Sequence, residues 1–207
     1  MKTRNSILFF LLLAFLNVSA QEEEKAEEQK NGLFKKENLF TGGTVNVSFG
    51  NQVTALGLSP FFGYSINRFV DVAATVGVNY ISQRDVSFYN ANDKLRQTIF
   101  GPGAFVRLFP LKFLFAQAQY EYNFIKYKYI PASGTGQPAE TTKLNAQSFL
   151  IGGGYAGGRD ADNNSYYYIS VLWDIAKSEN SPYTDNLNRS LPIIRAGYNI
   201  ALFQGRR

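Results

Sequence analysis

The sequence predicts an all-β protein, an eight-stranded antiparallel up-and-down transmembrane β-barrel. Three observations lead to this fold class. From about residue 39 onward, apolar residues alternate with small or polar ones, which is the period of a β-strand. In every strand whose facing the pattern decides, the apolar set is free of charge. Short connections alternate with long ones along the chain, as in barrels that cross an outer membrane.

The first 20 residues have the features of a secretory signal peptide. Lys2 and Arg4 precede an apolar run over residues 7–16, and residues 18–20 offer a small-x-small cleavage site. The run is too short for a transmembrane helix, which needs about 20 residues. Residues 21–38 are charged and lack periodicity, so we expect an acidic periplasmic linker ahead of the barrel.

The barrel is expected to occupy residues 39–203 and to contain eight strands. Their approximate ranges are 44–49, 56–66, 71–80, 100–108, 114–124, 147–156, 167–174 and 194–203. The sixth range is rich in glycine, and its pattern does not decide which way the side chains face. Because the strand number is even, both ends of the barrel should lie on the periplasmic side, with residues 204–207 as a short periplasmic tail.

The connections between these strands fall into two classes. Residues 67–70, 110–112 and 157–164 form short connections, expected in the periplasm. Residues 81–97, 126–146 and 176–190 form long connections, expected outside the cell. The turn at residues 50–52 departs from this habit, because it falls on the outer side and is short.

The charges decide which face of the barrel points outward. A soluble barrel of the lipocalin type has the same period with its faces exchanged, and its outer face would carry many lysines and glutamates. Here the polar set consists mostly of Gly, Ser, Thr, Asn and Gln, which suits a narrow packed interior. Aromatic residues at strand ends, such as Tyr80 and Trp173, fit interfacial girdles. The pattern therefore favours a membrane barrel over a soluble one.

Five charged residues fall in the inward set, and four of them can be paired. Asp71 and Arg107 lie near the periplasmic ends of adjacent strands, and Asp174 and Arg195 lie near the outer ends of another adjacent pair. We expect two ion pairs in the lumen, because pairing offsets the cost of burying charge. The fifth residue, Glu121, has no evident partner in the sequence, so a water-filled pocket or protonation would have to explain it.

Four basic residues extend the outward register past the apolar positions of the fourth and fifth strands. They are Lys94, Arg96, Lys126 and Lys128. A hairpin register that places Arg96 opposite Lys126 and Lys94 opposite Lys128 makes like charges face each other. One hypothesis is a rim that contacts lipopolysaccharide phosphates; the alternative is a set of solvated loop side chains.

The last strand ends in Tyr198, Ile200, Leu202 and Phe203. With the repeat pattern and the loop alternation, this ending resembles the eight-stranded outer-membrane barrels of the OmpX and OmpA-transmembrane type, over residues 39–203. The resemblance implies that barrel-assembly machinery reads these four residues as its signal. In contrast to OmpA-like proteins, no peptidoglycan-binding domain follows the barrel, so direct anchoring to the cell wall is not expected.

The composition limits the chemistry of the chain. It holds no histidine and no cysteine, which excludes imidazole bases, thiolate sites and disulfides. We therefore expect no catalytic, cofactor or metal site, and a non-catalytic structural or surface-interaction role in the outer membrane of a Gram-negative-type bacterium. The alternatives are an accessory subunit of a secretion or uptake complex and a narrow conduit. Expected partners are outer-membrane lipid including lipopolysaccharide, the assembly machinery and other envelope proteins, with no nucleic acid.

Overall fold

A computed structural model describes residues 34–49, 52–87, 92–160, 165–184 and 187–203. The chain divides into two compact units, Met1–Lys35 and Lys36–Arg207, and the fold below is that of the second unit. The expected signal peptide, nearly all of the expected linker and the expected tail at 204–207 lie outside the described residues. Within the described residues, no helix is long and apolar enough to cross a membrane.

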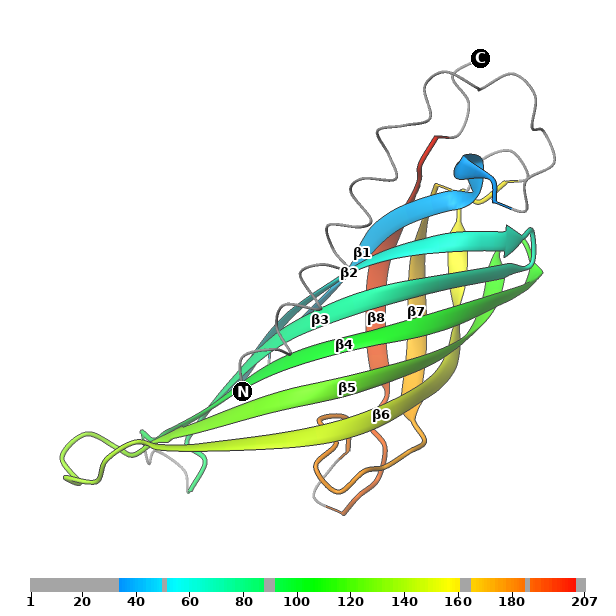
Figure 1. Ribbon diagram of the computed structural model, residues 1–207. Helices are drawn as coiled ribbons and strands as arrows, with labels where there is room; N and C mark the ends of the chain where they lie inside the picture. Colours follow the sequence, from blue (N-terminus) through cyan, green and yellow to red (C-terminus); the bar gives the residue numbers. More distant parts are fainter. Residues whose placement is uncertain (1–33, 50–51, 88–91, 161–164, 185–186, 204–207) are drawn as a thin grey trace, which may run out of the picture. The chain divides into compact units, whose positions relative to one another are not determined.

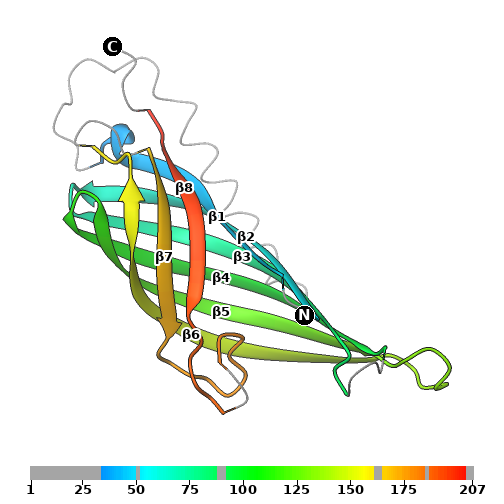
Figure 2. The same cartoon turned by 180° about the vertical axis from the view of Figure 1, so that it is seen from behind.

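The second unit is a closed antiparallel barrel of eight strands in sequence order, and the predicted fold class is confirmed (Figures 1 and 2). A short 3-10 turn, η1 (Lys36–Asn38), precedes the first strand. The strands are β1 (Leu39–Phe49), β2 (Val53–Asn67), β3 (Val70–Arg84), β4 (Lys94–Leu111), β5 (Leu114–Ile130), β6 (Glu140–Gly157), β7 (Tyr166–Asp174) and β8 (Ile193–Ala201). Pairing of β1 with β8 from Phe40↔Ala201 to Val45↔Ala196 closes the ring.

The two ends of the barrel differ in their connections. The start of β1 and the end of β8 lie together with the connections β2–β3, β4–β5 and β6–β7, and we call this the short-turn end. The connections β3–β4, β5–β6 and β7–β8 lie at the opposite end, which we call the long-loop end (Figure 1). The brief β1–β2 connection is also at the long-loop end, as the sequence predicted.

The strands bury one register and expose the other, and the exposed register is the apolar one. Ile169 is 50% exposed and Val78 is 48% exposed, whereas Asn199 and Ser148 have no exposed surface. A soluble barrel with an apolar interior, the alternative considered from the sequence, is therefore wrong. In β6 the odd-numbered side chains from Phe149 to Tyr155 point outward, which settles the facing that the sequence left open.

Close contact between strands explains the glycine content of β6. A Cβ atom added to Gly152 would lie 2.0 Å from the carbonyl oxygen of Val171 on β7. Real Cβ atoms do not approach a carbonyl this closely, so only glycine permits the observed packing of β6 against β7. The same glycines blur the two-residue period, and this is why the pattern of that strand was ambiguous.

The wall of the barrel is uneven in height. Strands β3 to β6 have 15 to 18 residues each, whereas β7 and β8 have 9 each. β6 pairs with β7 only from Leu150 to Gly157, so its residues 140–149 continue past the last residue pair of that ladder. Much of what the sequence assigned to long loops is therefore strand, and β3–β6 project beyond β7 and β8 at the long-loop end (Figure 2).

Candidate functional site

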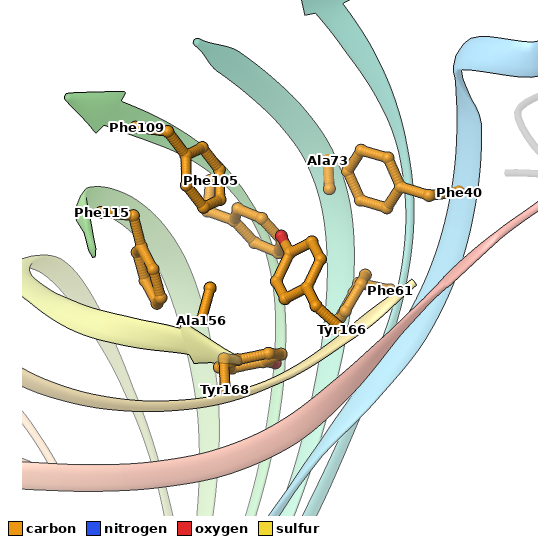
Figure 3. Packing of buried hydrophobic residues seen from close by; sticks show 9 residues of the cluster. All are labelled: Phe40, Phe61, Ala73, Phe105, Phe109, Phe115, Ala156, Tyr166 and Tyr168. Atoms are coloured by element: carbon orange, nitrogen blue, oxygen red, sulfur yellow. The ribbon is translucent and has the colours of Figure 1, made fainter. Parts of the chain in front are cut away.

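The half of the lumen near the short-turn end is filled by aromatic rings around one arginine. The cluster, seen in Figure 3, consists of Phe40, Phe61, Ala73, Phe105, Phe109, Phe115, Ala156, Tyr166 and Tyr168. The Arg107 guanidinium carbon lies 4.1 Å from the ring centroid of Tyr168 and 4.5 Å from that of Phe105. Ring faces are partly negative, so this cage compensates a charge that is only 1% exposed.

Asp71 and Arg107 face each other across β3 and β4, as the sequence suggested, but they do not form a direct ion pair. The hydroxyl of Tyr166 stands between them, accepting from Arg107 Nη1 at 3.4 Å and donating to Asp71 Oδ2 at 3.4 Å. The nearest cation to Asp71 is Arg159, whose Nη2 lies 3.8 Å from Asp71 Oδ1. The predicted pair is therefore an indirect one, and Asp71 is shared between two arginines.

Arg159 closes the lumen at the short-turn end, a role that no sequence pattern indicated. It belongs to the β6–β7 connection, yet its side chain is only 5% exposed. Its guanidinium carbon lies 3.7 Å from the Phe109 ring centroid, and Nη1 donates to the carbonyl oxygen of Arg68 at 3.1 Å.

A ladder of side-chain amides connects the two halves of the lumen. Arg107 Nε donates to Gln117 Oε1 at 2.8 Å, Gln117 donates to Gln119 at 2.7 Å, and Gln119 donates to Glu121 Oε1 at 2.7 Å. All four residues are at most 5% exposed. The ladder satisfies polar groups that would be costly to bury unpaired.

Arg195 pairs with Glu121 and not with Asp174, which corrects the second predicted ion pair. Arg195 Nη2 lies 2.9 Å from Glu121 Oε1 across the lumen. The reason is register: Arg195 stands opposite Ser170, so Asp174 is four residues, or about 13 Å, further along β7. Glu121, which had no evident partner in the sequence, thus has a cation.

Asp174 serves the β7–β8 connection. Its Oδ1 accepts from the backbone N–H groups of Phe149 and Ala176, each at 3.0 Å, and its Oδ2 accepts from Ser181. The carboxylate therefore fixes the start of this connection against β6.

The β7–β8 connection also sends a side chain into the lumen. The hydroxyl of Tyr183 donates to Glu121 Oε2 at 2.6 Å and lies 3.4 Å from Arg195 Nη2. Removal of this hydroxyl from water raises the pKa of Tyr183, so the group remains a donor. Tyr183 therefore completes the hydrogen bonding of the Glu121–Arg195 pair from the long-loop end.

The described lumen contains a cavity of only about 10 Å³. The cavity lies between Arg107 and Arg195, and its lining also includes Gln119 and Ser170. A space of this size holds about one water molecule. Side chains therefore leave little free space between Arg107 and Arg195, as expected of eight strands.

An apolar belt surrounds the outside of the barrel. On β5 it runs over residues 114–124, close to the about 9–11 residues that a tilted strand needs to cross a bilayer. Among the described residues of the belt, the outward positions carry no charge. Aromatic rings meet on it near both ends: Tyr155 lies 6.4 Å from Phe113 and from Tyr167, and Phe100 lies 6.2 Å from Phe124.

The predicted basic residues all lie beyond this belt at the long-loop end. The register between β4 and β5 differs from the predicted one by two residues, so each residue of β4 stands opposite a later residue of β5 than expected. Arg96 stands opposite Lys128, Lys94 opposite Ile130 and Lys126 opposite Thr98. The shift arises because β4 continues to Leu111 and turns through Lys112 and Phe113, so the hairpin is centred one residue later than expected.

The four residues of the expected assembly signal lie at the end of the chain's last strand. Tyr198 and Ile200 point outward from β8, which ends at Ala201. Leu202 extends the pairing by one hydrogen bond from its N–H to the carbonyl oxygen of Leu39, at 2.8 Å. Phe203 is 68% exposed and has a φ of 60°, a backbone conformation that does not continue a strand.

Two groups of lumen residues escaped the sequence analysis for different reasons. Arg159 and Tyr183 lie in connections, where no period indicates which side chains turn inward. The amide ladder did carry a signal, since Gln117, Gln119 and Glu121 alternate in one register. No group of His, Cys, Asp or Glu that could hold a metal ion occurs among the described residues.

Comparison with known proteins identifies no family, since no family model and no curated protein matches the chain. Among solved structures it is similar to Ail, the attachment invasion locus protein of Yersinia pestis. The complex of Ail with the heparin analogue sucrose octasulfate matches at 10% identity and a TM-score of 0.47, covering 78% of this chain and 96% of that chain. A second Ail structure matches at 12% identity and a TM-score of 0.44, with the same coverage.

The translocator domain of the autotransporter NalP from Neisseria meningitidis is also similar, at 11% identity and a TM-score of 0.39. That match covers 94% of this chain and 68% of the other. The chain's own strand order and count establish the architecture: a small eight-stranded up-and-down barrel, the kind of fold that the sequence resembled.

Proposed function

We propose that this protein is a non-catalytic integral barrel of a bacterial outer membrane, with a structural or surface-interaction role. One observation carries the proposal: an uncharged apolar belt encircles a lumen that is packed with hydrogen-bonded polar and aromatic side chains. A lysine or arginine on the lipid face costs about 2–4 kcal/mol at mid-membrane, so a charge-free belt suits lipid contact. The short-turn end would face the periplasm and the long-loop end the outside.

The packed lumen argues for a role other than conduction. The cavity between Arg107 and Arg195 has a volume of only about 10 Å³, and eight strands enclose an interior that side chains can just fill, which supports a role other than an open pore. A chain without histidine also lacks the usual general base, which supports a non-catalytic role. The surfaces left for function are the belt, which meets lipid, and the projecting ends of β3–β6, which can meet partners.

Lipid contact can be tested with Trp173, the single tryptophan of the chain, which lies on the outward face of β7. We expect its fluorescence to be quenched strongly by lipids brominated on their acyl chains and weakly by aqueous iodide. A Trp173→Phe variant gives the background, since no other tryptophan is present. Quenching by iodide alone would contradict insertion into the bilayer.

The partner can be sought once insertion is established. A tag after residue 207 that leaves assembly intact would allow gentle extraction from the membrane. A stoichiometric protein in the extract would indicate an accessory subunit of an envelope complex, whereas a barrel with lipid alone would support a stand-alone role. Recognition by barrel-assembly machinery can be tested by substituting Tyr198 and Phe203 and measuring insertion.

A further inference from the structure

Six basic side chains gather on the outward face of β3–β6, just beyond the apolar belt. We call this set the basic ladder; it consists of Arg84, Lys94, Arg96, Lys126, Lys128 and Lys143. All have outward positions, and five of the six are exposed, with Lys94 half-buried. Arg84 and Lys143 extend the rim expected from the sequence onto two further strands.

The strand register brings these cations together in pairs of like charge. Arg84 stands opposite Lys94, Arg96 opposite Lys128, and Lys126 opposite Lys143. Like charges directly opposite each other destabilise a sheet. Three such pairs on four neighbouring strands are unfavourable unless an anion lies among them.

The nearby carboxylates do not supply that anion. Asp85 and Asp93 belong to the β3–β4 loop and are used within it: Asp85 accepts from the Asn92 N–H at 2.8 Å, and Asp93 accepts from the N–H groups of Val86 and Ser87. Hydrogen bonds, above all from the Ser87 side chain, lower the pKa of Asp93. Within the described structure, no carboxylate forms an ion pair with a member of the ladder.

The height of the ladder indicates what the anion is attached to. On β5, Lys126 is the first outward position after Phe124, the last apolar residue of the belt. Successive outward positions are about 7 Å apart along a strand, so the cations begin at the edge of the belt. The polar headgroups of a bilayer lie at this level, directly outside its hydrocarbon.

From these contacts we propose that the basic ladder binds the phosphate groups of anionic glycolipid headgroups in the membrane leaflet at the long-loop end. The four strands are about 14 Å across, enough for a headgroup with more than one phosphate. Arg96 and Arg84 offer planar pairs of donors to phosphate oxygens, and the lysines act as mobile point charges. This proposal rests on the proposed function, because it requires the belt to lie in lipid.

The test compares two variants that each lose four positive charges. The ladder variant carries Arg96→Gln, Lys126→Gln, Lys128→Gln and Lys143→Gln. The matched control carries Lys36→Gln, Arg68→Gln, Lys112→Gln and Lys177→Gln, which are away from the ladder. Urea unfolding is followed by Trp173 fluorescence in phosphocholine vesicles with or without phosphorylated lipid A, with its dephosphorylated form, or with soluble pyrophosphate.

Phosphorylated lipid A should raise the unfolding midpoint of the original chain and the control, and should leave that of the ladder variant unchanged. In plain phosphocholine the ladder variant should be at least as stable as the original chain, because two of its three like-charge pairs are gone and only Arg84 opposite Lys94 remains. An equal rise with dephosphorylated lipid, with pyrophosphate, or in the ladder variant would overturn the proposal. Insertion into phosphocholine without any lipid A effect would refute it and leave the proposed function standing, whereas failure to insert would refute the proposed function.

Discussion

The two halves of the lumen each bury an arginine, and they compensate its charge in different ways. Near the short-turn end, Arg107 lies among ring faces and reaches Asp71 only through the Tyr166 hydroxyl. Toward the long-loop end, Arg195 contacts Glu121 directly at 2.9 Å. Compensation spread over several rings should tolerate the loss of any one group better than compensation by a single carboxylate.

The largest expected effect comes from breaking the direct pair. Glu121→Gln leaves Arg195 buried without its counter-charge, which should lower the free energy of unfolding by about 3–5 kcal/mol. Urea unfolding in phosphocholine vesicles measures this loss. The double variant Glu121→Met with Arg195→Met should recover most of it, since no unpaired charge remains. A double variant as unstable as the single one would show that packing, and not charge, dominates at this site.

A smaller loss is expected when one ring of the Arg107 cage is removed. Phe105→Leu should cost about 2 kcal/mol, because one desolvated cation–π contact is lost while an apolar side chain still fills the space. A double-mutant cycle with Arg107→Met separates the charge contribution from packing. If Phe105→Leu costs the same in both backgrounds, the ring does not stabilise the guanidinium, and the contrast between the halves fails.

The smallest effect is expected from the connection that covers the Glu121–Arg195 pair. Tyr183→Phe removes the hydroxyl that donates to Glu121 at 2.6 Å and should cost about 1 kcal/mol. The change should also speed proteolysis at the β7–β8 connection and leave the β5–β6 connection unaffected. Thr135→Val serves as a matched control in that second connection, where the hydroxyl bonds only to the carbonyl oxygen of Ala132.

Sequence reasoning succeeded where one physical rule acted alone. The two-residue period of β5 and β7, with an uncharged apolar set, was enough to predict strand, facing and closure. It failed where a side chain reached across the lumen. The strand that carries Arg195 pairs with β7, but the carboxylate that binds Arg195 is Glu121 on β5. The order of the strands can be predicted from the sequence. The register shift between neighbouring strands cannot, and this shift decides which inward side chains lie at the same height along the barrel axis.

The strand ends illustrate a second limit. Polar residues such as Arg96 and Lys126 lie outside the apolar pattern, so the sequence assigned them to loops. They are strand because a neighbour on each side still offers hydrogen bonds. Backbone pairing continues past the point where the hydrophobic pattern stops.

Because the strands differ in length, the two sides of this barrel differ at the long-loop end. On the side of β3–β6 the sheet continues past the lipid and carries the ladder cations, whereas on the side of β7 and β8 it stops soon after Trp173 and Ile194. A molecule that diffuses along the surface therefore meets continuous β-sheet from one direction and the β7–β8 connection from the other. Neighbouring proteins in a crowded membrane would therefore contact different surfaces on the two sides of the barrel, without any change in the barrel itself.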